Sequence, residues 1–120
     1  MNSQKEIENR EDLVLLIDEF YSKLLKDNSI NHFFVKLNLV EHLPKVVDFW
    51  AFVLLDENGY HVNVTEKHAH MKLKPEDFDK WVELFQATVD ELFIGEKAKI
   101  AKERAMLVSW TMNSKFNPNK

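Results

Sequence analysis

The stretch Glu66-Lys-His-Ala-His-Met-Lys-Leu-Lys-Pro-Glu-Asp-Phe-Asp-Lys-Trp81 decides how the rest of the fold is interpreted. It carries two histidines, His68 and His70, and then Pro75, which is typical of a first helical turn because proline has no N–H to satisfy there. A lone histidine in a charged segment is most often a solvated surface residue. A role for His68 therefore depends on whether other segments supply a pocket that faces it.

The composition favours one helical domain. The chain has 120 residues, and 45% of them are hydrophobic, which is enough for a single core. Only two glycines and three prolines are present, so the chain lacks the turn residues that a many-stranded β fold needs. Nine phenylalanines, three tryptophans and two tyrosines indicate a core or a pocket lined with aromatic rings.

Charge and cysteine content exclude several classes of protein. Disulfides, thiolate metal sites and a cysteine nucleophile are excluded because the chain has no cysteine. The net charge of −4 argues against a nucleic-acid partner, whose phosphates would select a basic face. No apolar run reaches the ~20 residues of a membrane span, and the first eight residues lack the apolar centre of a signal peptide. We therefore expect a soluble cytoplasmic domain.

Apolar residues recur at helical spacing over most of the chain, which predicts an all-α fold of about five helices. After a polar lead-in over residues 1–10, helical segments are expected over residues 11–27, 30–37, 40–55, 65–71, from 75 to the turn at Gly95, and 96–113. Pro44 is expected in or near the first turn of its helix, and Gly95 is expected to end the preceding helix in a left-handed conformation. We interpret residues 60–64 as an extended connection and residues 113–120 as a frayed tail.

Three polar residues interrupt otherwise apolar helix faces: Tyr21, His42 and Trp81. Burial of polar groups is costly unless something accepts or donates their hydrogen bonds. For any one of them, a separately satisfied core residue is the simpler interpretation. Taken together, they are candidates for one polar site formed by three helices.

A zinc site is an alternative for the histidine-rich stretch. On a strand, His68 and His70 would share a face, with His61 or Glu66 as a third ligand. The helical turns expected from Thr65 onward disfavour this arrangement, because residues two apart diverge on a helix.

The chain resembles the group III truncated haemoglobins from the first long helix to about Met112. The resemblance rests on the order and spacing of many motifs, none of which is specific alone. These motifs are Phe20-Tyr21, Phe34, His42-Leu43-Pro44, Phe49-Trp50, Leu54-Leu55, Tyr60, His68, Phe78-Asp-Lys-Trp81, Leu84-Phe85, Thr88-Val-Asp90, Phe93, Gly95, Ala98 and Arg104-Ala105. The resemblance implies a single truncated-globin domain over residues 1–120, with a two-over-two helical sandwich around haem b.

His68 resembles the proximal histidine that ligates the haem iron in this family. It stands ten residues before Phe78, and this distance favours it over His70. One departure from the family pattern lies nearby: a glycine is common shortly after Tyr60, whereas His61-Val-Asn-Val64 stands here. We expect this difference to stiffen or reshape the loop before the proximal histidine.

The resemblance also implies which residues surround the iron and the porphyrin. Tyr21, His42 and Trp81 match the positions that stabilise a ligand on the open side of the iron. The cofactor contacts that it implies are Phe34, Val46, Phe49, Tyr60, Lys67, His68, Phe78, Trp81 and Phe85. Charge alone suggests that Lys67, Lys72 and His61 meet the haem propionates.

The implied function is oxygen binding or transport by a five-coordinate, histidine-ligated iron that also takes NO or CO. Redox chemistry such as NO dioxygenation or peroxidase-like activity would need a reductase that the sequence does not identify. A second hypothesis is a haem-free helical interaction domain of globin shape, in which Tyr21, His42 and Trp81 are ordinary core residues. The sequence leaves the physiological ligand and the reaction open.

Overall fold

The computed structural model describes residues 4–35, 37–57 and 73–117. Within these ranges the chain forms four α-helices and one short 3-10 helix, with no β-strand. The elements are α1 (Arg10–Lys26), η1 (Asn31–Phe33), α2 (Leu39–Leu54), α4 (Pro75–Leu92) and α5 (Glu96–Phe116). The all-α prediction is confirmed, whereas the helix expected over residues 65–71 and the connection over 60–64 lie outside the described residues.

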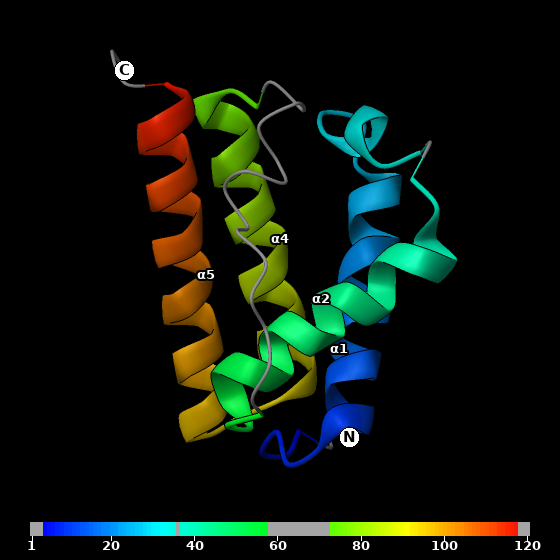
Figure 1. Cartoon of the computed structure of the whole chain (residues 1–120), viewed down its shortest axis with the longest axis vertical. Helices are drawn as coiled ribbons and strands as arrows, with labels where there is room; N and C mark the ends of the chain where they lie inside the picture. The colour runs from blue at the N-terminus through cyan, green and yellow to red at the C-terminus, as the bar shows by residue number, and fades with distance from the viewer. Residues whose placement is uncertain (1–3, 36, 58–72, 118–120) are drawn as a thin grey trace.

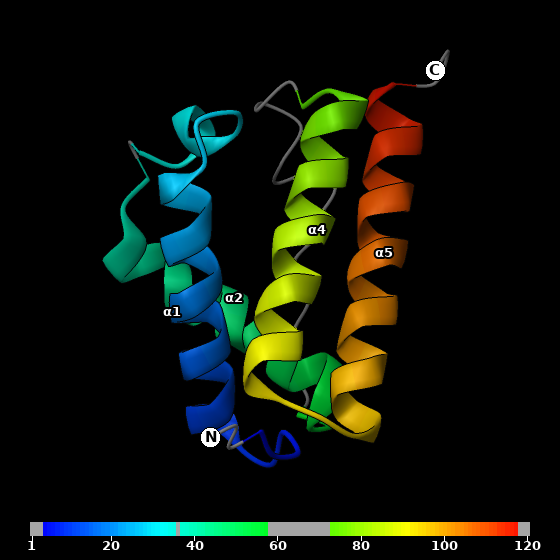
Figure 2. The same ribbon diagram turned by 180° about the vertical axis from the view of Figure 1, so that it is seen from behind.

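The helices pack as two pairs. α4 and α5 lie side by side and run in opposite directions, and α2 passes obliquely across α1 (Figure 1). Seen from behind, α1 and α4 stand next to each other with α2 beyond them (Figure 2). Contacts between α1 and α4 and between α2 and α5 join the two pairs. The core therefore lies where all four helices meet.

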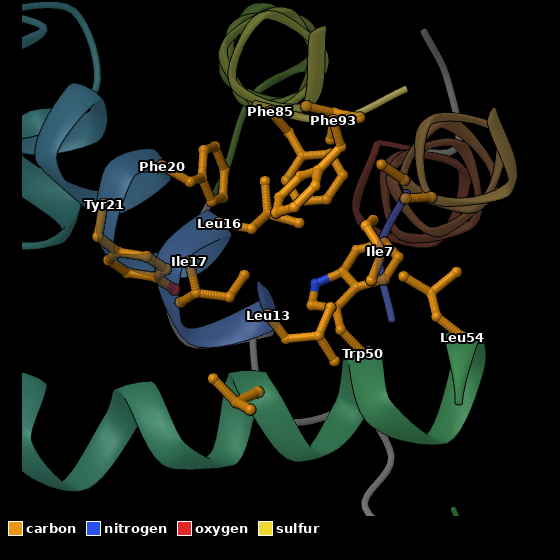
Figure 3. Close-up of a cluster of buried hydrophobic side chains, with 14 of the residues drawn as sticks. Ile7, Leu13, Leu16, Ile17, Phe20, Tyr21, Trp50, Leu54, Phe85 and Phe93 are labelled. Atoms are coloured by element: carbon orange, nitrogen blue, oxygen red, sulfur yellow. The ribbon is translucent and has the colours of Figure 1, made fainter. Parts of the chain in front are cut away.

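The buried face of α1 is the one that its spacing predicts. Its buried residues are Leu13, Leu16, Ile17, Phe20, Tyr21 and Leu24. The side chain of Asn9 caps the helix by accepting a hydrogen bond from the N–H of Asp12 at 3.0 Å. Acidic residues in the first turn and lysines in the last turn complement the helix dipole. The side chains from α1 meet aromatic rings of α2 and α4 in the core (Figure 3).

One expectation about the approach to α2 needs correction. The helix expected over residues 30–37 is limited to the single 3-10 turn η1. Pro44, expected in or near the first turn of α2, is the sixth residue of the helix and so lies in its second turn. It has no N–H to donate to the carbonyl of Val40, and Val40 is exposed, so water can bond this carbonyl.

The end of α5 also differs from the expectation. The helix continues to Phe116, three residues past the predicted end, so residues 113–116 are helical and not frayed. The side-chain amide of Asn117 donates to the carbonyl of Leu73 at 3.2 Å. This bond ties the last turn of α5 to the residues that precede α4.

The N-terminal segment is more than a polar lead-in. Ile7 is fully buried, and the N–H of Ile94 donates to the carbonyl of Lys5 at 2.9 Å. The carboxylate of Glu6 accepts hydrogen bonds from the N–H groups of Glu96 and Lys97, each at 3.0 Å, and thus caps the N-terminus of α5.

Gly95 is the residue that allows this cap. Its φ of 108° and ψ of −167° are extended mirror-image values and not those of a left-handed helix end, so that expectation was wrong. Gly95 is the N-cap of α5, whereas α4 already ends at Leu92. A Cβ at this position would collide with the carboxylate of Glu6.

No helix in the described ranges is both long and apolar enough to cross a membrane.

Candidate functional site

Tyr21 and His42 form the polar centre of the candidate site. The hydroxyl of Tyr21, on the buried face of α1, lies 2.8 Å from Nε2 of His42 on α2. The ring of Tyr21 is 6% exposed, and Phe34 stands edge-on to it with 5.7 Å between ring centroids. The phenol is therefore held in place by α1, by α2 and by the residue that follows η1.

Burial raises the pKa of the Tyr21 phenol above its ordinary value, because the phenolate would lose its hydration. The side chain thus stays a neutral O–H at neutral pH. Either it donates its proton to Nε2 of His42, or it accepts a hydrogen bond from Nε2–H of the other histidine tautomer. Only the second arrangement leaves the phenol proton free for another acceptor.

Trp81 joins this pair through the ring of Phe20. Trp81 is half-buried on α4, and the edge-to-face contact between its ring and Phe20 has a centroid distance of 5.6 Å. Phe20 meets Tyr21 in the same manner, also at 5.6 Å. The structure therefore brings the three polar candidates to one region, with Tyr21 and His42 in direct contact and Trp81 in contact with Phe20, which also contacts Tyr21.

α2 presents two apolar stripes with different environments. Val47, Trp50 and Leu54 are buried in the core. The adjoining stripe starts at His42 and continues along the same face through residues that are half-buried and packed against the core: Val46, Phe49 and Val53. Val46, Phe49 and Val53 thus form a half-buried apolar stripe that runs along α2 from His42.

Phe85 and Phe78 are the most deeply buried of the expected cofactor contacts. Phe85 is 0% exposed and is enclosed by other aromatic rings. Phe78 is also buried, with its ring 5.9 Å from that of Phe116 near the end of α5. Both rings meet protein groups in this structure, and their contact with a cofactor stays a prediction.

The other expected residues of the site cannot be placed. His68, Tyr60 and Lys67 lie outside the described residues, as do His70 and the further zinc or propionate candidates His61, Glu66 and Lys72. Among the residues that are described, no three histidine, aspartate or glutamate side chains gather in a way that could hold a metal ion.

Two residues of this region were expected only as parts of family motifs and buried helix faces, without a role in the site. Phe20 and Trp50 belong to predicted buried faces, and the pattern identifies them only as core. The structure shows that Phe20 contacts both Tyr21 and Trp81, and that Trp50 stacks on Phe85. Helical periodicity indicates that a side chain is buried, and it carries no signal for which ring the side chain will meet.

Comparison with known proteins agrees with this architecture. No protein-family model matches the chain. The group 3 truncated haemoglobin ctb of Campylobacter jejuni is 27% identical over 108 residues, which cover 84% of this chain and 85% of that protein. The group 1 truncated haemoglobin of Tetrahymena thermophila is 34% identical over 87 residues, which cover 68% of this chain and 72% of that protein. The chain therefore belongs to the truncated haemoglobin family.

The crystal structure of the group III truncated haemoglobin from Campylobacter jejuni superposes with a TM-score of 0.87 and covers 98% of both chains at 24% identity. This match confirms the truncated globin fold. The group 3 protein of Campylobacter jejuni matches a larger share of this chain than the Tetrahymena relative does, and it confirms the group III resemblance.

Proposed function

We propose that this globin haem protein binds O2 and other diatomic ligands reversibly at a haem b iron ligated by His68. The family supports haem as the cofactor. The observation that carries the finer proposal is the Tyr21–His42 pair, joined at 2.8 Å at one end of the half-exposed apolar stripe of α2. A small polar ligand on an apolar cofactor needs polar groups beside an apolar surface, and this pair lies at the margin of such a surface.

The residues present suit the haem group. Porphyrin is a large, flat and mostly apolar ring, and it needs apolar walls with a few polar groups near the iron. The half-buried side chains Val46 and Phe49 supply such a wall on α2, and Phe34 extends it beside Tyr21. We assign the iron to His68, with Tyr60 and Lys67 as further contacts.

When it is bound, haem supplies an iron with an open coordination position for a diatomic ligand. The contribution of the chain is a hydrogen-bond donor that stays neutral. A tyrosine is a neutral O–H donor at neutral pH, and burial raises the pKa of Tyr21 further, so the donor is retained. We propose that Nε2–H of His42 donates to the Tyr21 oxygen, which directs the phenol proton toward the ligand.

The indole N–H of Trp81 is the second proposed donor. Tyr21 of α1 and Trp81 of α4 both contact the ring of Phe20, so the two proposed donors come from different helices. A preorganised pair of donors stabilises a ligand that gains negative charge, because the donors need no reorganisation when the charge appears.

The first test is a titration of the purified protein with haemin, followed by absorption spectra of the reduced protein with and without CO. We expect a Soret band that shifts on addition of CO. His68→Ala should abolish the five-coordinate spectrum, and the matched control His70→Ala should retain it. If the effects of the two substitutions are reversed, the assignment of the iron ligand is wrong. If the wild-type protein takes up no haemin, the haem-free interaction domain becomes the better hypothesis.

A further inference from the structure

Three aromatic rings form a parallel stack that crosses the core from α4 to α2. Phe85 is the middle ring, 5.8 Å from Trp81 with 9° between their planes. Phe85 also lies 4.8 Å from Trp50 with 16° between their planes. The order Trp81–Phe85–Trp50 therefore links a half-buried polar candidate to the fully enclosed centre of the protein.

A fourth ring fixes this stack from the side. Phe20 of α1 meets Phe85 edge-on at 5.1 Å and Trp81 edge-on at 5.6 Å. A stacked contact restrains the plane of a ring, whereas an edge-to-face contact restrains the position of the ring within that plane. The indole of Trp81 is thus restrained in both respects, although the side chain itself is only half-buried.

Phe85 is the residue through which these restraints act. It is 0% exposed, so its whole surface is used in packing against protein groups. Trp50 is 2% exposed and supports Phe85 through their stacked contact. Close-packed interiors transmit such constraints, because a ring in this position cannot turn without displacing its neighbours.

We propose that Phe85 is a positioning residue that sets the direction of the Trp81 indole N–H toward the ligand, with Trp50 as its support. This inference rests on the proposed function, because it concerns the second donor of the same site. It gives Phe85 a role through Trp81 in place of the direct cofactor contact that the family resemblance implied. The shape of the Phe85 ring, more than its volume, is then what the site requires.

The test replaces the flat ring by flexible side chains of slightly smaller volume, Phe85→Leu and Phe85→Met. Methionine adapts to irregular gaps, so the second variant is expected to fold even where the first is destabilised. In the haem-free protein, the indole N–H resonance of Trp81 in a ¹⁵N-labelled sample should move and broaden in both variants. In the CO complex, the C–O stretching band should shift in the same direction as in Trp81→Phe, and O2 should dissociate faster by up to about tenfold, the equivalent of one net hydrogen bond.

Phe93→Leu is the matched control. Phe93 is 3% exposed, belongs to the same hydrophobic core and follows the last residue of α4. Its truncation should lower stability to a similar degree while the C–O band and the Trp81 resonance stay in place. A shift of the band in Phe93→Leu equal to that in the Phe85 variants would overturn the positioning role, because any core defect would then suffice.

The outcomes separate this inference from the proposed function. If the wild-type protein binds no haem, the proposed function fails and the positioning role fails with it. If haem and CO bind but the band and the indole resonance are unchanged in both Phe85 variants, only the positioning role fails. It also fails, without reference to any variant, if the Trp81 indole of the wild-type protein is shown by NMR relaxation to be mobile on the nanosecond timescale.

Discussion

Tyr21→Phe is the substitution that tests the proposed site most directly. It removes one hydroxyl group and keeps the ring. The edge-to-face contacts of that ring with Phe20 at 5.6 Å and Phe34 at 5.7 Å involve only carbon atoms, so the variant should keep its packing. The loss is therefore confined to the hydrogen bond with Nε2 of His42 and to any bond that the phenol makes with a ligand.

The expected cost in stability is small. A typical hydrogen bond contributes about 0.5–1.5 kcal/mol net, and a partner left buried without a bond costs more. His42 is half-buried, so water can reach its ring nitrogen when the hydroxyl is gone. We therefore expect the free energy of unfolding to fall by about 0.5 kcal/mol, which is the lower end of the range for a single hydrogen bond.

The expected effect on ligand binding is larger. A hydrogen bond to a group that carries charge is worth about 1.5–3 kcal/mol, which corresponds to a roughly tenfold to 150-fold faster dissociation of O2. Stopped-flow mixing of the oxygenated protein with excess CO measures this rate. CO dissociation, measured by displacement with NO, serves as the internal comparison, since CO gains little negative charge and should respond far less.

Unchanged O2 dissociation in a folded, haem-loaded Tyr21→Phe protein would refute the reasoning. It would mean that the phenol proton points to His42 in the ligand complex, and that the histidine tautomer is the opposite of the one proposed. His42→Leu distinguishes the two directions of the hydrogen bond between Tyr21 and His42. If Nε2–H of His42 orients the phenol, this variant should also speed O2 dissociation, although by less than Tyr21→Phe does.

Three further predictions concern the scaffold. Burial raises the pKa of Tyr21 above 10, so above pH 10 the unfolded chain releases this proton while the folded chain keeps it. Above pH 10, the free energy of unfolding of the wild-type protein should therefore fall relative to that of Tyr21→Phe by about 1.4 kcal/mol per pH unit. Urea denaturation measures this difference, and the same pH dependence of stability in both proteins would contradict the prediction. Gly95→Ala should lower the free energy of unfolding by about 2–3 kcal/mol, because it strains a residue at φ 108° and displaces the Glu6 cap. In a double-mutant cycle with Glu6→Ala, the two losses should overlap by about 1 kcal/mol, and strictly additive losses would show that the cap is unaffected. Arg10→Ala removes two exposed ion pairs, with Asp48 at 2.6 Å and with Glu57 at 2.8 Å. It should lower the free energy of unfolding by less than about 1 kcal/mol and lose this effect in 1 M salt, whereas a larger, salt-independent loss would point to packing by the arginine stem.

The helices could be predicted from the sequence because their apolar spacing is a local property. α1 was expected over residues 11–27 and is found at Arg10–Lys26, and its buried face is the predicted one. The errors arise where a distant contact decides the local conformation. Gly95 adopts its positive φ beside the carboxylate of Glu6, which is ninety residues from the N–H of Glu96 that it caps. No local pattern around Gly95 contains that information.

The candidate site could be predicted only in part, for a related reason. Tyr21, His42 and Trp81 stand out as polar residues on apolar faces, and this observation requires only periodicity. The hydrogen bond between Tyr21 and His42 depends on how α1 and α2 cross, which periodicity does not specify. Without the family resemblance, the residues alone left the zinc site and the haem-free interaction domain as open alternatives.

The parts of the site differ in how tightly the core holds them, and this difference bears on how the site can respond to a ligand. Tyr21 and Trp81 both rest on Phe20, and Phe20 rests on Phe85, so their relative placement is fixed by buried rings. His42 reaches the site from the half-buried stripe of α2, and it is held to Tyr21 by a hydrogen bond and not by packing in that core. Ligand entry or a change in the histidine tautomer can therefore alter one hydrogen bond while both proposed donors keep their positions. The ligand can thus change the direction of the Tyr21–His42 hydrogen bond, while the aromatic core keeps its arrangement.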